Sequence, residues 1–165
     1  MSGIVNHTGA VSGVIGSKSM RQSSISSFHI GSTGGWDTWQ NEKVDHFTVS
    51  NSYSGHPHNV GNNYVLASSH YIAPIDGLYV IYLMAYTFWD DTAGHFYVAI
   101  DDSVIANQAD GMLMNTTSAT PDKMFNFSQI FEGKAGDVFS IRAQSNTSDM
   151  HGGNSWFGGW LVCGT

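Results

Sequence analysis

Two histidines in the first half of the chain have the residue type and spacing of a metal site. His56 and His58 lie two positions apart, so on an extended backbone their imidazoles would point the same way. Repeated around a threefold axis, the pair would offer six nitrogens, enough for an octahedral transition metal. The alternative is a polar loop whose histidines contact only water.

Adjacent carboxylates suggest a second kind of site. They occur at Asp90-Asp91 and Asp101-Asp102. Neighbouring residues of a strand point to opposite faces, so neither pair forms an acid–base couple on a regular strand. In loops the same oxygens would suit Ca²⁺, which prefers hard oxygen ligands. The alternative is that these residues form solvated turns.

The motifs that carry common enzyme chemistry are absent from the sequence. It contains no Gly-x-Ser-x-Gly elbow, no His-Glu-x-x-His, no Walker loop and no dinucleotide fingerprint. We therefore predict a protein that is not an enzyme and needs no cofactor, with Ca²⁺ or an axial transition metal as the only candidates for a bound ion.

A binding role has more support in the sequence. Trp36 and Trp39, in "GGWDTWQ", could stack against a sugar ring while neighbouring polar groups donate hydrogen bonds, although burial in a core is the simpler role. The connections 90–94, 109–122 and 145–155 are polar, as expected of loops that contact a receptor. The candidate ligand-binding residues are Trp36, Trp39, Asp90, Asp91, Asp110, Asp149 and His151.

Composition restricts the class of protein and its partners. The chain of 165 residues suits one domain, and with only 12% charged residues and 19 glycines it is typical of turn-rich β structure. A net charge of −7 argues against nucleic acid as a partner. The longest apolar run, 79–89, is too short to span a bilayer, and no export signal is evident. Cys163 has no disulfide partner, and its apolar surroundings predict a buried thiol.

The pattern of apolar runs predicts an all-β sandwich. Short strand-like segments follow one another from residue 28 onward, separated by Gly, Pro, Asn or Asp, and none resembles a crossover helix. Turns are expected at 101–103 and 132–137, each joining antiparallel strands. The predicted strands are 28–31, 36–40, 44–50, 63–67, 77–89, 94–101, 103–108, 123–132, 137–145 and 155–163.

Two of these strands are apolar on both faces, which predicts self-association. A strand of a two-layer sandwich has only one inward face, so segment 77–89 and the C-terminal strand would expose the other. A second copy of the chain could cover that face; alternatively, the N-terminal segment or a loop covers it within one subunit. The residues assigned to the trimer interface or core are Tyr79, Ile81, Leu83, Trp89, Trp156, Phe157, Trp160 and Leu161.

Several segments resemble the globular head of the complement q-subcomponent and tumour-necrosis-factor superfamily. "YIAPIDGLYVIYLMAYTF", "HFYVAIDDSVIANQ", "FNFSQIFEGKAGDVFSIRAQ" and "SWFGGWLVCGT" occur in the order of that family's strands, within residues 44–165. The sequence departs from the family at Asp101-Asp102, where Asn-Gly is usual, and lacks a collagen-like stem. The resemblance implies a ten-stranded jelly roll that forms a homotrimer.

The N-terminal segment points to a virion. Residues 1–27 contain no aromatic side chain, and "TGAVSGVIGS" resembles the openings of bacteriophage tail-fibre and other virion proteins. We therefore expect an arm at 1–27 that attaches a jelly-roll head at 28–165 to other virion proteins. The expected function is a tail-fibre or receptor-binding protein that contacts a host-surface glycan or protein. The alternatives are a capsid decoration or head-fibre protein, or a secreted complement-like module.

Overall fold

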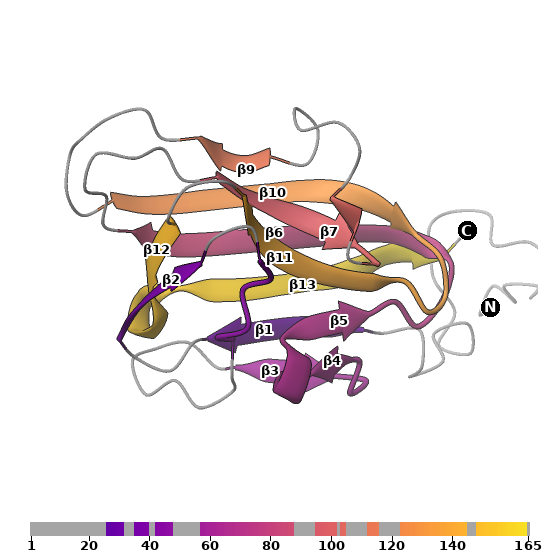
Figure 1. Cartoon of the computed structure of the whole chain (residues 1–165). Coiled ribbons are helices and arrows are strands. Elements are labelled where there is room, and N and C mark those ends of the chain that lie inside the picture. Colours follow the sequence, from indigo (N-terminus) through magenta and orange to yellow (C-terminus); the bar gives the residue numbers. More distant parts are fainter. Residues whose placement is uncertain are drawn as a thin grey trace, which may run out of the picture.

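A computed structural model shows two β-sheets packed face to face, which confirms the predicted all-β jelly roll (Figure 1). It describes residues 26–31, 35–39, 42–47, 57–87, 95–101, 103–104, 112–115, 123–144 and 148–164. The strands are β1 (Ser27–Gly31), β2 (Trp36–Trp39), β3 (His58–Val60), β4 (Tyr64–Val65), β5 (His70–Ile72), β6 (Gly77–Thr87), β7 (His95–Ile100), β8 (Ser103–Val104), β9 (Met112–Asn115), β10 (Lys123–Gly133), β11 (Val138–Gln144), β12 (Ser148–His151) and β13 (Trp156–Gly164). Two 3-10 turns, η2 (Leu66–Ser68) and η3 (Gly152–Asn154), interrupt them. Within the described ranges, no helix is long and apolar enough to cross a bilayer.

The strands form two large sheets and one small ribbon. The five-stranded sheet has the order β10-β6-β13-β1-β3, and all of its neighbours are antiparallel. The six-stranded sheet has the order β4-β5-β11-β7-β8, with β9 also paired to β7. Strands β2 and β12, more than a hundred residues apart in the sequence, form the two-stranded ribbon.

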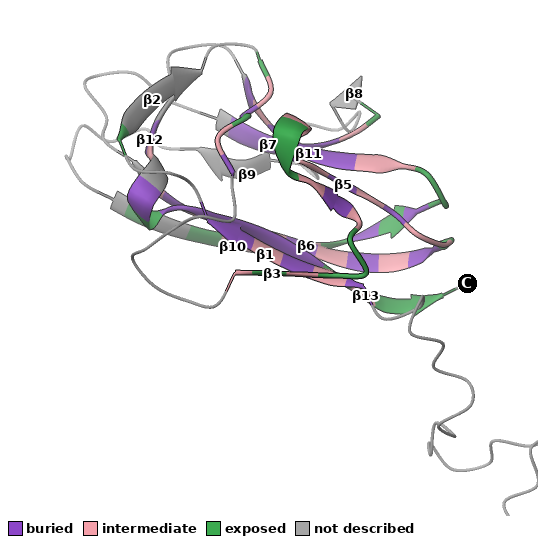
Figure 2. Cartoon of the chain, turned by 90° about the horizontal axis from the view of Figure 1, so that it is seen from below, coloured by how far each residue is buried: buried purple, intermediate pink, exposed green. Residues whose placement is uncertain are grey.

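The hydrophobic core lies between the two large sheets, and strand alternation builds it. On β6 the odd-numbered residues from 77 to 85 are buried, while the even-numbered ones from 78 to 86 are half-buried. Figure 2 shows this alternation as purple and pink bands. Phe28 of β1 stacks on Tyr71 of β5 with ring centroids 4.5 Å apart, joining the two sheets. Burial of each such side chain stabilises the fold by about 1.5–3 kcal/mol.

The structure divides the chain into more and shorter strands than the ten that the sequence indicates. Parts of the predicted loops 109–122 and 145–155 are strands, namely β9 and β12. Strands β3 and β5 also lie where we predicted connections. These segments are three or four residues long, too short for an alternating pattern to be read, and a neighbouring strand specifies them instead. Conversely, residues 44–46 of the predicted strand 44–50 form no ladder.

The two predicted turns have different outcomes. Ile100 pairs with Ser103 across the turn at Asp101, so the expected hairpin between β7 and β8 is confirmed. The turn at 132–137 does not join paired strands, because β10 pairs with β6 and β11 pairs with β5 and β7. It carries the chain from one sheet to the other. Turn residues alone do not distinguish a hairpin from such a crossover, since both need the same backbone reversal.

Candidate functional site

The face of the five-stranded sheet that points away from the core is the candidate functional site. We call it the outer face; it comprises the side chains of β10, β6, β13, β1 and β3 that alternate with the core residues. Six large hydrophobic side chains are exposed in the described part of the chain, and five of them lie on strands of this sheet. These five are Val60, Met124, Ile130, Trp160 and Val162.

One row of residues crosses the whole sheet on this face. The register aligns Ile130 with Val80, Val80 with Trp160, Trp160 with Ser27, and Ser27 with Val60. Ile130 is 57% exposed and Trp160 is 46% exposed, although both are large apolar side chains. Contiguous apolar surface of this kind marks an interaction site in soluble proteins.

The centre of the outer face is aromatic. Tyr82 of β6 lies over Gly158 of β13, and its hydroxyl hydrogen-bonds with Nδ1 of His29 on β1. The His29 ring stacks on Trp156 with centroids 4.6 Å apart and planes 7° apart. On the other side, His58 of β3 pairs with His29 in the register, with ring centroids 6.1 Å apart.

Burial shifts the pKa values of Tyr82 and His29 in the direction that favours their neutral forms. It raises the pKa of Tyr82 to about 12, so the phenol stays protonated. Burial, and then repulsion from His58, lowers the pKa of His29 below its ordinary value of 6.5. Neutral side chains cost less to remove from water than charged ones, which favours burial of this centre against another molecule.

A shallow hollow adjoins the aromatic centre between β6 and β10. Its volume is about 270 Å³, and it is lined by Tyr82, Leu83, Asn126, Phe127 and Ser128. The amide of Asn126 and the hydroxyl of Ser128 add hydrogen-bonding groups to an otherwise apolar surface. The outer face therefore offers a partner a hollow and hydrogen-bonding groups as well as hydrophobic area.

The residues predicted for the trimer interface or core separate into two sets. Tyr79, Ile81, Leu83 and Phe157 are buried in the core between the sheets, and Leu161 packs against it. Trp156 and Trp160 belong to the outer face. Trp89 lies outside the described residues. The sequence did not assign the outer-face residues Val80, Tyr82, Ile130 and His29 to an interface. The opposing sheet decides which set of alternate residues faces inward, and the sequence does not show that sheet.

The metal predictions stay predictions, because most of their residues lie outside the described part of the chain. No three histidine, cysteine, aspartate or glutamate side chains gather there as a metal site. His58 lies beside His29, and His56 is outside the described residues, as are Asp90, Asp91 and Asp110. Asp101 is a turn residue: its carboxylate accepts a hydrogen bond from the Val138 amide at 3.0 Å. The burial predicted for Cys163 is wrong, because the last residues of β13 extend past the core and leave the thiol exposed.

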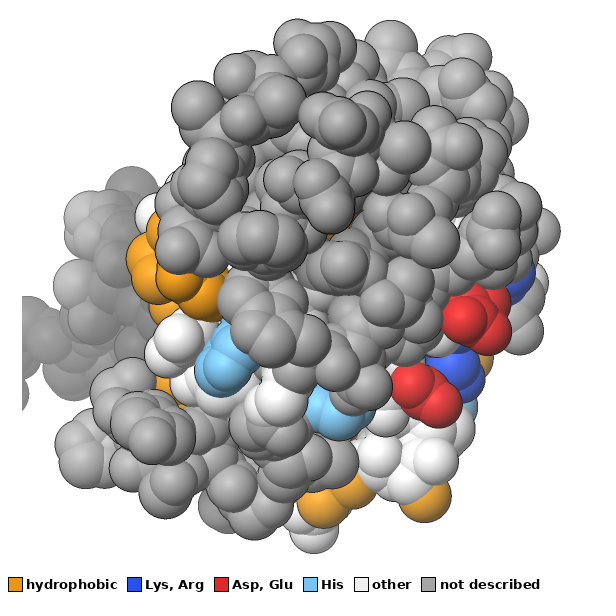
Figure 3. All heavy atoms as spheres, turned by 60° about the vertical axis from the view of Figure 1, so that its left-hand side comes forward, with side chains coloured by type: hydrophobic (Ala, Val, Ile, Leu, Met, Phe, Trp, Pro, Cys, Tyr) orange, Lys and Arg blue, Asp and Glu red, His pale blue; other side chains and the backbone are white. Residues whose placement is uncertain are grey.

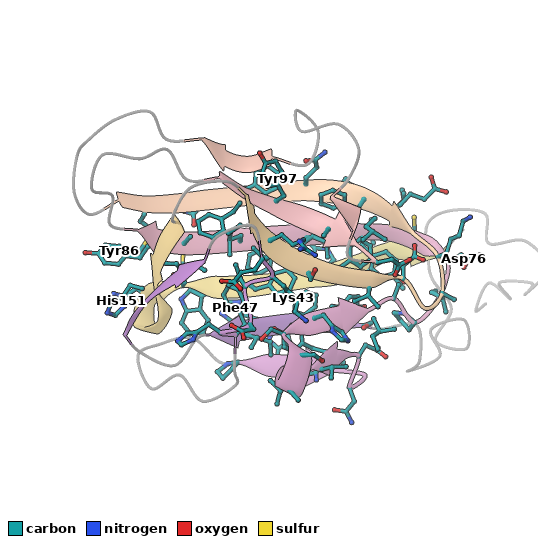
Figure 4. All side chains as sticks on the ribbon, viewed as in Figure 1. Lys43, Phe47, Asp76, Tyr86, Tyr97 and His151 are labelled. Carbon is teal, nitrogen blue, oxygen red and sulfur yellow. The ribbon has the colours of Figure 1, made fainter. Side chains whose placement is uncertain are left out.

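Four predicted ligand-binding residues lie on the two strands of the small ribbon. Trp36 is opposite His151 in the β2–β12 register. Asp149 is opposite Thr38, two pairs further along and next to the pair formed by Trp39 and Ser148. The His151 ring meets Tyr86 edge-on at 5.9 Å, at the end of β6 (Figure 4). Figure 3 shows this end of the molecule, where histidine side chains reach the surface. The ribbon is the second candidate binding region.

Comparison with known proteins identifies the fold. No protein-family model matches the sequence. No curated protein matches it either. Among solved structures, Eiger TNF from S. frugiperda has a TM-score of 0.60 at 15% identity, covering 86% of this chain and 94% of that one. The globular domain of zebrafish complement 1qA has a TM-score of 0.59 at 8% identity, with coverage of 85% and 99%. Pika GITRL has a TM-score of 0.51 at 15% identity, with coverage of 85% and 97%. The chain therefore has the jelly-roll fold of tumour-necrosis-factor and complement heads.

Proposed function

We propose that this chain forms a homotrimeric, non-enzymatic binding head whose copies associate through the outer face. The observation that carries the proposal is the row from Ile130 to Val60, which crosses all five strands and exposes the large apolar side chains of Ile130, Trp160 and Val60. The resemblance to the complement and tumour-necrosis-factor heads suggests three as the number of copies.

Hydrophobic burial provides the driving force for this association. Each large apolar side chain contributes roughly 1.5–3 kcal/mol when it is fully buried, and every copy brings the same set to the interface. The association itself costs about 4–15 kcal/mol in lost freedom of motion, so several such side chains must be buried together. A row that spans the sheet meets this requirement better than scattered surface residues would.

The molar mass in solution tests the proposal. We expect sedimentation equilibrium at micromolar concentration to give three protomers for the wild type and one for Ile130→Asp, because a carboxylate would be buried against apolar surface. Leu66→Asp is the matched control, since Leu66 is 41% exposed in η2, outside the five-stranded sheet. It should remain trimeric. A wild-type monomer at this concentration would contradict the proposal.

The biological setting we propose is a bacteriophage virion. In this proposal residues 1–27 attach the head to a fibre shaft or capsid, and the β2–β12 ribbon contacts a glycan or protein on the host surface. The N-terminal resemblance to virion proteins supports the attachment, and the polar and aromatic residues of the ribbon support the contact. Trp36→Ala and His151→Ala should reduce adsorption of purified head to host cells while the trimeric mass is retained.

A decoration protein would behave differently in the same experiment. Its wild-type head would not adsorb to cells, and labelled protein would locate to the capsid on intact particles. That outcome would reject the receptor-binding role and leave the trimeric head intact.

A further inference from the structure

His29 and His58 come from distant parts of the sequence, yet the structure places them directly opposite each other. They pair across β1 and β3, with ring centroids 6.1 Å apart and planes inclined by 22°. Cross-strand neighbours on the same face have their Cβ atoms about 4.5–5.5 Å apart, close enough for both imidazoles to reach one ion. This arrangement includes His58 but not His56, the histidine with which the sequence pairs it.

The contacts of His29 fix the position of its ring. Strand β1 lies between β13 and β3, and Tyr82 reaches His29 from the β13 side to hydrogen-bond with Nδ1. Because Tyr82 engages Nδ1, the ring nitrogen that we consider as a metal ligand is Nε2. Stacking on Trp156 at 4.6 Å holds the plane of the ring.

The hydrogen bond to Tyr82 suits His29 as a ligand. Metal binding requires the neutral imidazole, which binds a metal through one ring nitrogen. A hydrogen bond to the other ring nitrogen is the usual way in which proteins fix the tautomer and orientation of a metal-bound histidine. Tyr82 therefore acts as a positioning residue.

We propose that His29 and His58 form a two-imidazole site for a divalent transition metal of the Zn²⁺, Cu²⁺ or Ni²⁺ type, to which imidazole is well suited. Among the described side chains, no carboxylate, thiolate or further imidazole completes the set, so water supplies the remaining positions in a single chain. The site requires only the pairing of β1 with β3, so it forms within a single chain, although His29 and Tyr82 lie on the face through which the trimer is proposed to associate.

Metal titration of the purified full-length chain, after EDTA treatment and dialysis, tests the site. We expect calorimetry with Zn²⁺ to give one site per chain, and Cu²⁺ spectra to show hyperfine coupling to two imidazole nitrogens. His29→Asn and His58→Asn should each weaken Zn²⁺ binding by at least about tenfold. Tyr82→Phe should weaken it by about tenfold, because the hydrogen bond that positions His29 is lost.

Two control variants separate this site from other histidines. His56→Asn should leave Zn²⁺ binding unchanged, and so should His70→Asn on β5 of the other sheet. If His56→Asn abolished Zn²⁺ binding and His29→Asn had no effect on it, the proposal would be overturned in favour of a site formed by His56 and His58. Unchanged binding in His58→Asn would also overturn it, and because His58 is exposed, that variant should fold. The Ile130→Asp variant should still bind Zn²⁺, which separates this inference from the proposed trimer.

Discussion

The ring of Tyr82 occupies the space that a side chain at position 158 would fill. A Cβ placed on Gly158 would lie 2.1 Å from both Cζ and the hydroxyl oxygen of Tyr82, far inside contact distance. Because Gly158 has no side chain, the tyrosine crosses β13 and reaches His29 on β1. The absence of a side chain at position 158 thus allows Tyr82 to connect three strands of the outer face, β6, β13 and β1.

The Gly158→Ala variant should disrupt this connection. Its methyl group would displace Tyr82, and we expect the free energy of unfolding to fall by about 1–3 kcal/mol, the usual cost of overpacking. Urea denaturation measures the change. In a Tyr82→Ala background the same substitution should cost much less, since no ring remains to be displaced. Equal costs in both backgrounds would contradict the proposed contact.

Phe157 should be among the most sensitive positions of the core. Its side chain is fully buried between the sheets and contacts the ring of Phe28 at 4.9 Å between centroids. Phe157→Ala should lower the free energy of unfolding by about 3–5 kcal/mol, through lost burial and the cavity left behind. Leu66→Ala is the control; as an exposed residue it should change stability by no more than about 0.5 kcal/mol.

Asp101 should be replaceable by Asn but not by Ala. It has a positive φ of 51°, and its carboxylate accepts a hydrogen bond from the amide of Val138. Asn tolerates this backbone conformation and can accept the same bond, whereas Ala loses the acceptor. We expect a loss of about 1–2 kcal/mol for Asp101→Ala and a much smaller change for Asp101→Asn, measured as thermal or urea unfolding. Similar losses in both variants would argue against a role for the carboxylate oxygen.

Alkaline pH should destabilise the head through Tyr71. Burial is the main cause that raises the pKa of this phenol to about 12 from an ordinary value of 10.0. The folded pKa lies above the unfolded one, so the stabilisation is complete below pH 10 and is lost as the pH rises through about 12. Tyr71 also donates a hydrogen bond to the Ser26 hydroxyl at 2.6 Å, which requires the neutral phenol.

Urea unfolding at increasing pH, together with the tyrosinate absorbance, measures this dependence. Tyr71→Phe removes the titrating group and should make stability fall less steeply between pH 10 and pH 12. Tyr64, whose pKa burial also raises, remains in that variant and should preserve part of the slope. The same slope in wild type and Tyr71→Phe would contradict the assignment.

The sequence alone was sufficient to predict the fold class. Alternating apolar residues, turn signals and the scarcity of helix formers indicated a β-sandwich, and the structure confirms it. The long strands β6, β10, β11 and β13 were predicted to within a few residues because each is long enough to show its periodicity. The sequence also indicated that segment 77–89 is apolar on both faces, which first suggested self-association.

Only the tertiary structure decided which face is which and which distant residues meet. A strand's period of two gives two equivalent faces, and the opposing sheet selects Ile81 for the core and Val80 for the outer face. The meetings of His29 with His58 and of Trp36 with His151 depend on strand order and register. These pairings join residues that are far apart along the chain, so local sequence patterns do not predict them.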